Sequence, residues 1–228
     1  NPGHPETSEQ VARIVIGAVK SNGLPDGTFA MVQGRSNETG TRLVMHPRIM
    51  AVGFTGSVRG GRALFDAAAK RQVHIPVYAE MGSTNPVFIL PEMLAQKGEG
   101  IAKLLAASNM SSAGQFCTNP GIMVATRTAG AEKFYQAFGD VIRHTPSSEM
   151  LNKGIYGSFE KSMKKMEAKK SVSLLAVTDT PRQDQGEPHA FSTGADDFLG
   201  DKELWEEMFG PSSVQVTATD IREMIEVA

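Results

Sequence analysis

The sequence contains a single cysteine, and the residues around it indicate possible chemistry. Cys117 stands in "GQFCTNP", residues 114–120, between a predicted helix and a predicted strand. A thiolate in a loop held by a rigid scaffold can attack a carbonyl carbon and form a covalent intermediate. The nearest histidines along the chain are His74 and His144, so a local Cys–His pair is not indicated. The alternative is a buried, unreactive thiol, which is the commoner state of an isolated cysteine.

A carboxylate at the end of an apolar stretch is the second candidate. Glu80 follows "HIPVYA" and is itself followed by Met81 and Gly82. A carboxylate at the end of an apolar strand is poorly solvated, which raises its pKa and suits a general base. The alternative is a glutamate that points into water, which is the commoner case for this residue type.

Two further stretches are ambiguous when each is taken alone. "VGFTGSVRGGRAL", residues 52–64, combines a strand, a glycine-rich turn and a helix that begins near Ser57. Glycines and the N–H groups of a helix start can bind a phosphate, but the spacing is not the usual dinucleotide fingerprint. Taken alone, this stretch therefore favours a tight turn capped by Ser57. "WEEMFGPS", residues 205–212, predicts a helix end and a turn, with Trp205 and Phe209 as packing residues.

These candidates need a scaffold, and the hydrophobic periodicity predicts alternating helices and strands, which is typical of an α/β fold. The predicted helices cover residues 6–23, 37–46, 57–71, 98–113, 129–143, 148–170 and 220–228. The predicted strands cover residues 29–34, 49–54, 74–81, 85–90, 121–126, 171–177 and 212–218. Residues 178–201 are rich in turn formers and charge, so we expect an irregular surface segment there.

Composition and charge argue against several classes of function. The chain has 228 residues and a net charge of -2, so nothing favours nucleic acid or an anionic membrane as the main partner. The apolar runs are too short to span a bilayer, and the first residues do not resemble a signal peptide. With one cysteine, we expect a cytoplasmic protein. The histidines, from His4 onward, are scattered, so no metal site is expected.

Taken together and in order, the motifs are more specific. "FTGS", "EMGSTNP", "GQFCT" and "EEMFGP" resemble the aldehyde dehydrogenase superfamily, and the resemblance covers essentially the whole chain. It implies that Cys117 is the catalytic nucleophile and Glu80 the general base, while Phe116 and Thr118 shape the aldehyde pocket. The cofactor-binding residues that it implies are Phe54, Thr55, Gly56, Ser57, Gly61, Met81, Gly82, Glu207 and Phe209.

The resemblance also implies partners and a branch of the superfamily. We expect NAD or NADP as cofactor, a small-molecule aldehyde as substrate and a homo-oligomer for the full-length protein. Ser83 and Thr84 stand where many relatives have Gly and Lys. This variant is similar to the branch that oxidises 2,5-dioxopentanoate (α-ketoglutaric semialdehyde) to 2-oxoglutarate. The alternatives are a broad-specificity aldehyde dehydrogenase, a non-catalytic protein that keeps the fold, and a thiol redox sensor.

The implied fold is an aldehyde dehydrogenase-like α/β fold in two parts. Residues 1–79 are expected to form the later part of a Rossmann-like NAD(P)-binding domain. Residues 80–228 are expected to form a C-terminally incomplete α/β catalytic domain with its own mixed or parallel sheet. Because the family's N-terminal half has no counterpart here, we expect an internal fragment with little or no activity by itself.

Overall fold

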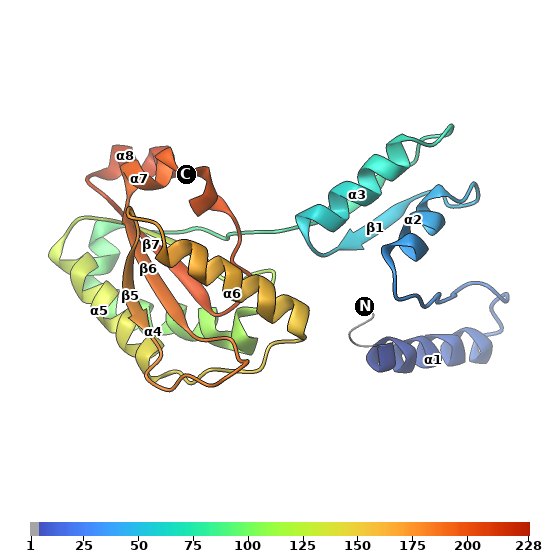
Figure 1. The fold of residues 1–228 in the computed structure, drawn as a ribbon, viewed down its shortest axis with the longest axis horizontal. Coiled ribbons are helices and arrows are strands. Elements are labelled where there is room, and N and C mark those ends of the chain that lie inside the picture. The colour runs from blue at the N-terminus through green and yellow to red at the C-terminus, as the bar shows by residue number, and fades with distance from the viewer. Residues whose placement is uncertain (1–4) are drawn as a thin grey trace. The chain divides into compact units, whose positions relative to one another are not determined.

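The computed structural model describes residues 5–228 and divides them into two units, with the boundary between Met81 and Gly82. His4 therefore lies outside the described residues. Both units combine helices with parallel strands, and the predicted α/β fold class is confirmed. Figure 1 shows the order of the elements along the chain.

Over the described residues 5–81, the first unit contains three helices and two strands. The helices are α1 (Pro5–Ser21), α2 (Asn37–Met45) and α3 (Val58–Ala69), and the strands are β1 (Val52–Thr55) and β2 (Val77–Glu80). The strands pair in parallel, with Val52 opposite Val77 and Thr55 opposite Glu80. Helix α3 therefore connects two parallel strands, and the turn before it lies beside the end of β2.

Local sequence explains where these helices begin and end. The hydroxyl of Ser57 accepts a hydrogen bond from the backbone N–H of Gly60 at 3.2 Å, which caps α3. Helix α2 ends at Met45, just before Pro47, because the residue before a proline disfavours helical backbone. The strand predicted over residues 29–34 is wrong. That segment has no backbone pairing partner among residues 5–228, and a strand needs one.

The second unit is built on a five-stranded sheet in the order β3-β4-β7-β6-β5. The strands are β3 (Val87–Ile89), β4 (Ile122–Thr126), β5 (Ser173–Val177), β6 (His189–Gly194) and β7 (Ser212–Ala218). All neighbours are parallel except β5, which pairs with β6 in the antiparallel sense. Every residue of β4 is buried, as expected of a parallel strand that is covered on both faces.

Helices cover both faces of this sheet. One face packs on α4 (Pro91–Met110) and α5 (Ala129–His144), around the fully buried Phe134 and Phe138. The other face packs on α6 (Lys153–Glu167), α7 (Ala195–Gly200) and α8 (Ile221–Val227), around the buried Phe159 and Phe191. Figure 1 shows α5 and α6 on opposite sides of the strands. The central strands are therefore packed between helices on both faces, and the loops at their ends start from fixed positions.

Two predictions about this unit need correction. Residues 178–201 are not an irregular surface segment throughout, because they contain β6 and α7. Ala190 and Phe191 are fully buried in β6, which lies between β5 and β7, so tertiary packing overrides the local turn formers. Helix α4 begins at Pro91 and not near residue 98, since a proline is well suited to the first helical position.

Candidate active site

Cys117 lies in the loop that connects α4 to β4, directly after the short 3-10 turn η1 (Ser111–Gly114). Its side chain is a free thiol and the residue is exposed. The alternative of a buried, space-filling cysteine is therefore wrong. Phe116 and Thr118, on either side, are also exposed, and the Phe116 side chain retains 50% of its surface. The loop thus presents a thiol between two accessible side chains.

The backbone before this loop turns in an unusual way. Ser112, Ala113 and Gly114 have φ angles of 51°, 53° and 66°, so three consecutive residues adopt the left-handed region. This region is costly for residues that carry a Cβ atom. A Cβ on Gly114 would lie 2.1 Å from the backbone oxygen of Gly210 and 2.6 Å from the nitrogen of Pro211. Position 114 therefore requires glycine for both conformation and space.

Asparagine and glutamine amides hold the loop in place. Asn119 donates through Nδ2 to the carbonyl oxygens of Gly114 and Gly210, at 3.0 Å and 3.2 Å, and accepts from Asn109 at 2.8 Å. Asn109 is fully buried at the end of α4. Gln115 donates to its own turn and accepts from the backbone N–H of Leu151 at 2.8 Å. Charge-free amides therefore tie the cysteine loop to segments far away in the sequence.

Asn85 supplies a further link to the cysteine itself. Its Nδ2 atom donates to the carbonyl oxygens of Cys117 and Asn119, at 2.8 Å and 2.9 Å. Its Oδ1 atom accepts from the hydroxyl of Ser83 at 2.8 Å. The backbone of Asn85 is left-handed, with a φ of 42°, a conformation that asparagine tolerates better than most residues.

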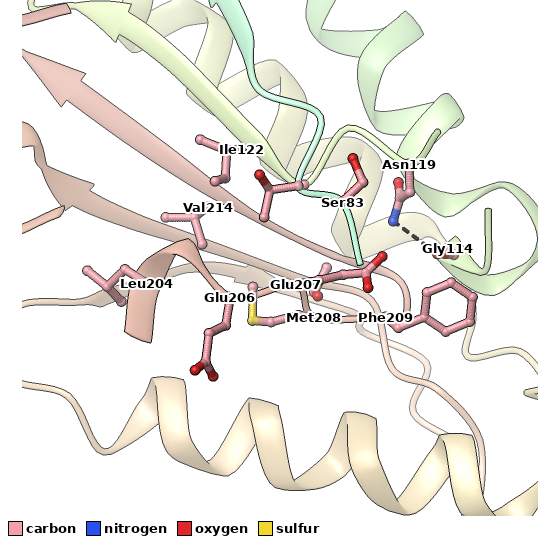
Figure 2. A pocket seen from close by; sticks show the side chains of 13 residues that line it. Ser83, Gly114, Asn119, Ile122, Leu204, Glu206, Glu207, Met208, Phe209 and Val214 are labelled. Carbon is pink, nitrogen blue, oxygen red and sulfur yellow. Dashed lines mark hydrogen bonds between the residues drawn. The ribbon is translucent and has the colours of Figure 1, made fainter. Parts of the chain in front are cut away.

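A small pocket of about 20 Å³ lies beside this loop, large enough for about one water molecule. Figure 2 shows the Glu207 side chain directed toward Ser83, with the hydrogen bond from Asn119 to Gly114 drawn nearby. The lining residues are Ser83, Thr84, Gly114, Asn119, Gly121, Ile122, Leu204, Glu206, Glu207, Met208, Phe209, Ser212 and Val214.

The surroundings of Glu207 change the pKa of its carboxyl group. Partial burial raises the pKa of its carboxyl group, and a hydrogen bond from the backbone N–H of Ser83 acts in the opposite direction. The residue still has exposed surface, so it can meet a ligand. Glu207 and Phe209, both expected to bind the cofactor, therefore line one pocket with Ser83.

Ion pairs fix the segment that leads to Glu207. Lys169, two residues after the end of α6, lies 2.6 Å from Asp201 and 2.7 Å from Glu203. Lys165 lies 3.1 Å from Glu203. Lys169 lowers the pKa values of Asp201 and Glu203 through these hydrogen bonds. The pairs connect α6 with the turn η2 (Lys202–Trp205), which precedes the pocket.

The remaining expected residues belong to the first unit, except for Gly82, which opens the second. Phe54 and Thr55 end β1, and Gly56 and Ser57 form the turn before α3. No acidic residue lies in the first turn of α3, which suits an anion. A Cβ on Gly61 would lie 2.5 Å from the sulfur of Met81, so those two residues pack closely.

Glu80 ends β2 and is exposed within its own unit. That unit does not supply the burial that the sequence analysis expected around the carboxylate, and the role of Glu80 stays a prediction. The structure thus gathers the expected residues into two separate sets. One set surrounds the Gly56 turn and the end of β2, and the other surrounds Cys117 and Glu207.

Sequence reasoning missed the amides that hold the loop. A signal was present, because "STNP" and "CTNP" repeat an Asn-Pro pair at residues 85–86 and 119–120. Both asparagines proved to be the central donors around Cys117. Over residues 5–228, no cluster of three His, Cys, Asp or Glu side chains forms that could hold a metal ion. Within the same residues, no helix is long and apolar enough to cross a membrane.

Comparison with known proteins decides the family. Residues 4–228 match the family described as the aldehyde dehydrogenase family. The chain belongs to the aldehyde dehydrogenase family. The resemblance noted in the sequence is therefore confirmed over nearly the whole chain.

Two curated relatives carry the same name. The chain is 37% identical over 220 residues to an alpha-ketoglutaric semialdehyde dehydrogenase of Acinetobacter baylyi. The matched region covers 96% of the chain and 41% of that protein. It is 36% identical over 225 residues to alpha-ketoglutaric semialdehyde dehydrogenase 2 of Azospirillum brasilense, covering 98% of the chain and 43% of that protein. The chain thus spans about two fifths of the length of these relatives.

Solved structures share the fold at lower identity. An NAD-dependent benzaldehyde dehydrogenase from Corynebacterium glutamicum is 21% identical with a TM-score of 0.77, over 92% of this chain and 46% of that one. A putative aldehyde dehydrogenase from Burkholderia cenocepacia is 21% identical with a TM-score of 0.79, over 96% of this chain and 47% of that one. These similarities support the aldehyde dehydrogenase fold of the family.

Proposed function

We propose that this chain supplies the nucleophile and part of the cofactor site of an NAD(P)-dependent aldehyde dehydrogenase. The observation that carries the proposal is the exposed thiol of Cys117, in a loop whose carbonyl oxygens are held by Asn85 and Asn119. A fixed and accessible thiol suits covalent catalysis, since the reacting atom must be positioned to attack a bound carbonyl group.

The chemistry follows from the cysteine. The Cys117 thiolate attacks the aldehyde carbon to form a thiohemiacetal, and the backbone N–H of Cys117 is one donor for the resulting oxyanion. Oxidation of this adduct leaves a thioester on Cys117. Glu80 is the proposed base that takes a proton from water, and the water attacks the thioester to release the carboxylate and the free thiol. Phe116 and Thr118 would line the aldehyde pocket.

The residues present fit a dinucleotide. Helix α3 begins at a glycine-containing turn, lacks acidic residues in its first turn, and carries Gly61 where a Cβ would meet Met81. Its free N–H groups would bind the pyrophosphate near Gly56 and Ser57. Glu207 is the proposed acceptor for ribose hydroxyl groups, and Phe209 would lie against the nicotinamide. NAD or NADP, when bound, supplies the hydride acceptor for the reaction.

Further residues of both units complete the proposed cofactor site. Phe54 and Thr55 come immediately before the pyrophosphate turn, and Met81 and Gly82 come immediately after the proposed base. Their backbone groups would face the dinucleotide. The proposed division of labour is a cofactor-binding part at residues 1–79 and a catalytic part at residues 80–228, acting in a homo-oligomer of the full-length protein.

The proposed substrate is 2,5-dioxopentanoate, oxidised to 2-oxoglutarate. The support is that both curated relatives are named for this semialdehyde, at 36% and 37% identity. Ser83 and Thr84, the residues that depart from the common Gly-Lys pattern, line the pocket beside Glu207. The substrate proposal therefore rests on relatives, and the chemical proposal rests on the cysteine loop.

The test uses the full-length protein, of which this chain is all or a part. Formation of reduced nicotinamide is followed with 2,5-dioxopentanoate or butanal, each with NAD or NADP. We expect Cys117→Ala to abolish oxidation. Glu80→Gln should release one equivalent of reduced nicotinamide and then slow by about 10²–10⁴-fold, because the thioester waits for hydrolysis.

The control and the contrary outcomes are clear. Glu99→Gln, an exposed substitution on α4, should leave both phases unchanged. A higher kcat/KM for butanal would replace the substrate proposal with a broad-specificity enzyme. Full activity in Cys117→Ala would refute the covalent mechanism, and a wild-type protein that oxidises neither aldehyde would favour a non-catalytic member of the family.

A further inference from the structure

The side-chain amide of Asn85 donates both of its hydrogens to backbone carbonyl oxygens of the cysteine loop. Its two N–H bonds meet two acceptors, the carbonyl oxygens of Cys117 at 2.8 Å and Asn119 at 2.9 Å. The reverse orientation of the amide would place an oxygen against two carbonyl oxygens, so the contacts fix which atom is nitrogen. One side chain therefore holds the backbone on both sides of Thr118.

Ser83 holds Asn85 in turn. Its hydroxyl donates to Oδ1 of Asn85 at 2.8 Å, so the acceptor side of the amide also has a partner. Ser83 is one of the residues that depart from the glycine expected in many relatives. A glycine at this position has no hydroxyl, so it would leave Oδ1 of Asn85 without this donor.

Ser83 also lines the pocket that contains Glu207. The backbone N–H of Ser83 also acts on the carboxyl group of Glu207, where it opposes the rise in pKa that burial causes. Ser83, Asn119, Glu207 and Phe209 all line that pocket. Figure 2 shows Ser83 and Glu207 within it. Hydrogen bonds thus run from Ser83 through Asn85 to the carbonyl oxygen of Cys117, and Glu207 lines the same pocket as Ser83.

We propose that Ser83 and Asn85 are positioning residues that couple the occupancy of Glu207 by the cofactor ribose to the placement and reactivity of the Cys117 thiol. This inference rests on the proposed function, because it takes Glu207 as the ribose acceptor. A ribose hydroxyl that bonds to Glu207 competes with the N–H of Ser83. Ser83 then shifts, and its hydroxyl carries the shift to Asn85 and to the loop. The links from Ser83 to Asn85 and from Asn85 to Cys117 are hydrogen bonds, and all four residues lie in the unit from Gly82 to Ala228.

The first measurement needs no cofactor. The rate of Cys117 alkylation by iodoacetamide is followed against pH in the wild type and in Asn85→Gly, which keeps the left-handed backbone accessible but removes the amide. Loss of both loop contacts should change the rate at pH 7 by at least about threefold, as expected for a lost hydrogen bond. Asn22→Gly, at an exposed position just after α1, is the matched control and should leave the rate unchanged. An unchanged rate in Asn85→Gly would overturn the role of Asn85.

The second measurement adds NAD or NADP at saturation, with binding followed separately by isothermal titration calorimetry. The wild-type alkylation rate should change on binding. Ser83→Ala should bind the cofactor, yet the change in alkylation rate should fall below about half of the wild-type change, since one link is lost. Ser83→Thr retains the hydroxyl and should restore the response, while Ser158→Ala on α6 should respond like the wild type.

The outcomes separate this inference from the proposed function. Both measurements use the full-length protein. If its wild type binds neither NAD nor NADP, the proposed function fails and the coupling fails with it. If the wild type responds to the cofactor and Ser83→Ala responds equally, the proposed function stands and the coupling is overturned. If Ser83→Thr behaves like Ser83→Ala, the hydroxyl is not the link, and the proposed route from Ser83 to Asn85 is wrong.

Discussion

The loop before the cysteine depends on Gly114, and replacing it by alanine tests how tightly the site is built. Gly114 has a φ of 66°, and a Cβ there would lie 2.1 Å from the oxygen of Gly210 and 2.2 Å from its carbonyl carbon. Optimal contacts between carbon atoms are about 3.5–4.0 Å. Both obstructing atoms belong to the backbone, so no side-chain rotation can relieve the overlap.

The expected cost has two parts. Placing an alanine in the left-handed region costs about 1–2 kcal/mol. Forcing the backbone of residues 210–211 to move, beside the buried Phe159, costs about 1–3 kcal/mol more, as for other overpacked sites. We therefore expect Gly114→Ala to lower the free energy of unfolding by about 2–5 kcal/mol, which is a large part of the stability of a typical domain.

Urea unfolding followed by Trp205 fluorescence provides the assay, because Trp205 lies in the same unit and its indole N–H donates to the carbonyl of Phe198. Gly157→Ala is the control. A Cβ there meets nothing within 4 Å, and the residue is inside α6, so we expect a gain of about 0.5–1 kcal/mol. A loss below about 1 kcal/mol for Gly114→Ala would show that the loop yields easily, and would refute the argument from its rigidity.

Three further predictions concern the core, the ion pairs and the pocket. Phe134→Ala should destabilise the second unit by about 3–5 kcal/mol, measured by urea unfolding, because the ring is fully buried between α5 and α4. Lys169 lowers the pKa values of Asp201 and Glu203 in the folded state, so their contribution to stability is present above the unfolded pKa values and is lost as the pH falls through the folded ones. Lys169→Met should therefore flatten the acid limb of a plot of unfolding free energy against pH, and an unaltered acid limb would contradict this reasoning. Burial raises the pKa of Glu207, which means that ionisation of this carboxyl opposes folding as the pH rises through the unfolded pKa. Glu207→Gln should remove that pH-dependent loss while weakening NAD or NADP binding, as titrated by fluorescence, and a steeper loss of stability at neutral pH would count against it.

Periodicity predicted most elements, because their apolar residues carry the pattern of the final packing. The buried β4 and the amphipathic α5 follow directly from "GIMVAT" and residues 129–143. The two errors in strand assignment have one physical cause, which is that strand formation depends on partners distant in sequence. Residues 29–34 look like a strand but find none to pair with in the described chain, whereas β6 looks irregular but is held between β5 and β7.

Part of the candidate site could be predicted from the sequence, because some of its residues belong to local motifs. Cys117, Glu80 and Glu207 belong to local motifs, so their residue types and neighbours can be read directly from the chain. The contacts of Asn85 with Cys117 and Asn119 join positions more than thirty residues apart, and no local pattern specifies them. The left-handed turn at Ser112 and Ala113 was also hidden, because neither residue type signals that conformation.

The two asparagines that hold the cysteine loop each precede a proline, Pro86 and Pro120. Spontaneous deamidation begins when the backbone nitrogen of the following residue attacks the side-chain amide. A proline nitrogen carries no hydrogen, so this ring closure is blocked. Asn22, which precedes Gly23 in the sequence, has no such protection. A stored sample should therefore gain a negative charge at Asn22, just after α1, well before the cysteine loop loses either of its amide donors. Deamidation during storage should then be detectable by charge while the geometry of the Cys117 loop is still intact.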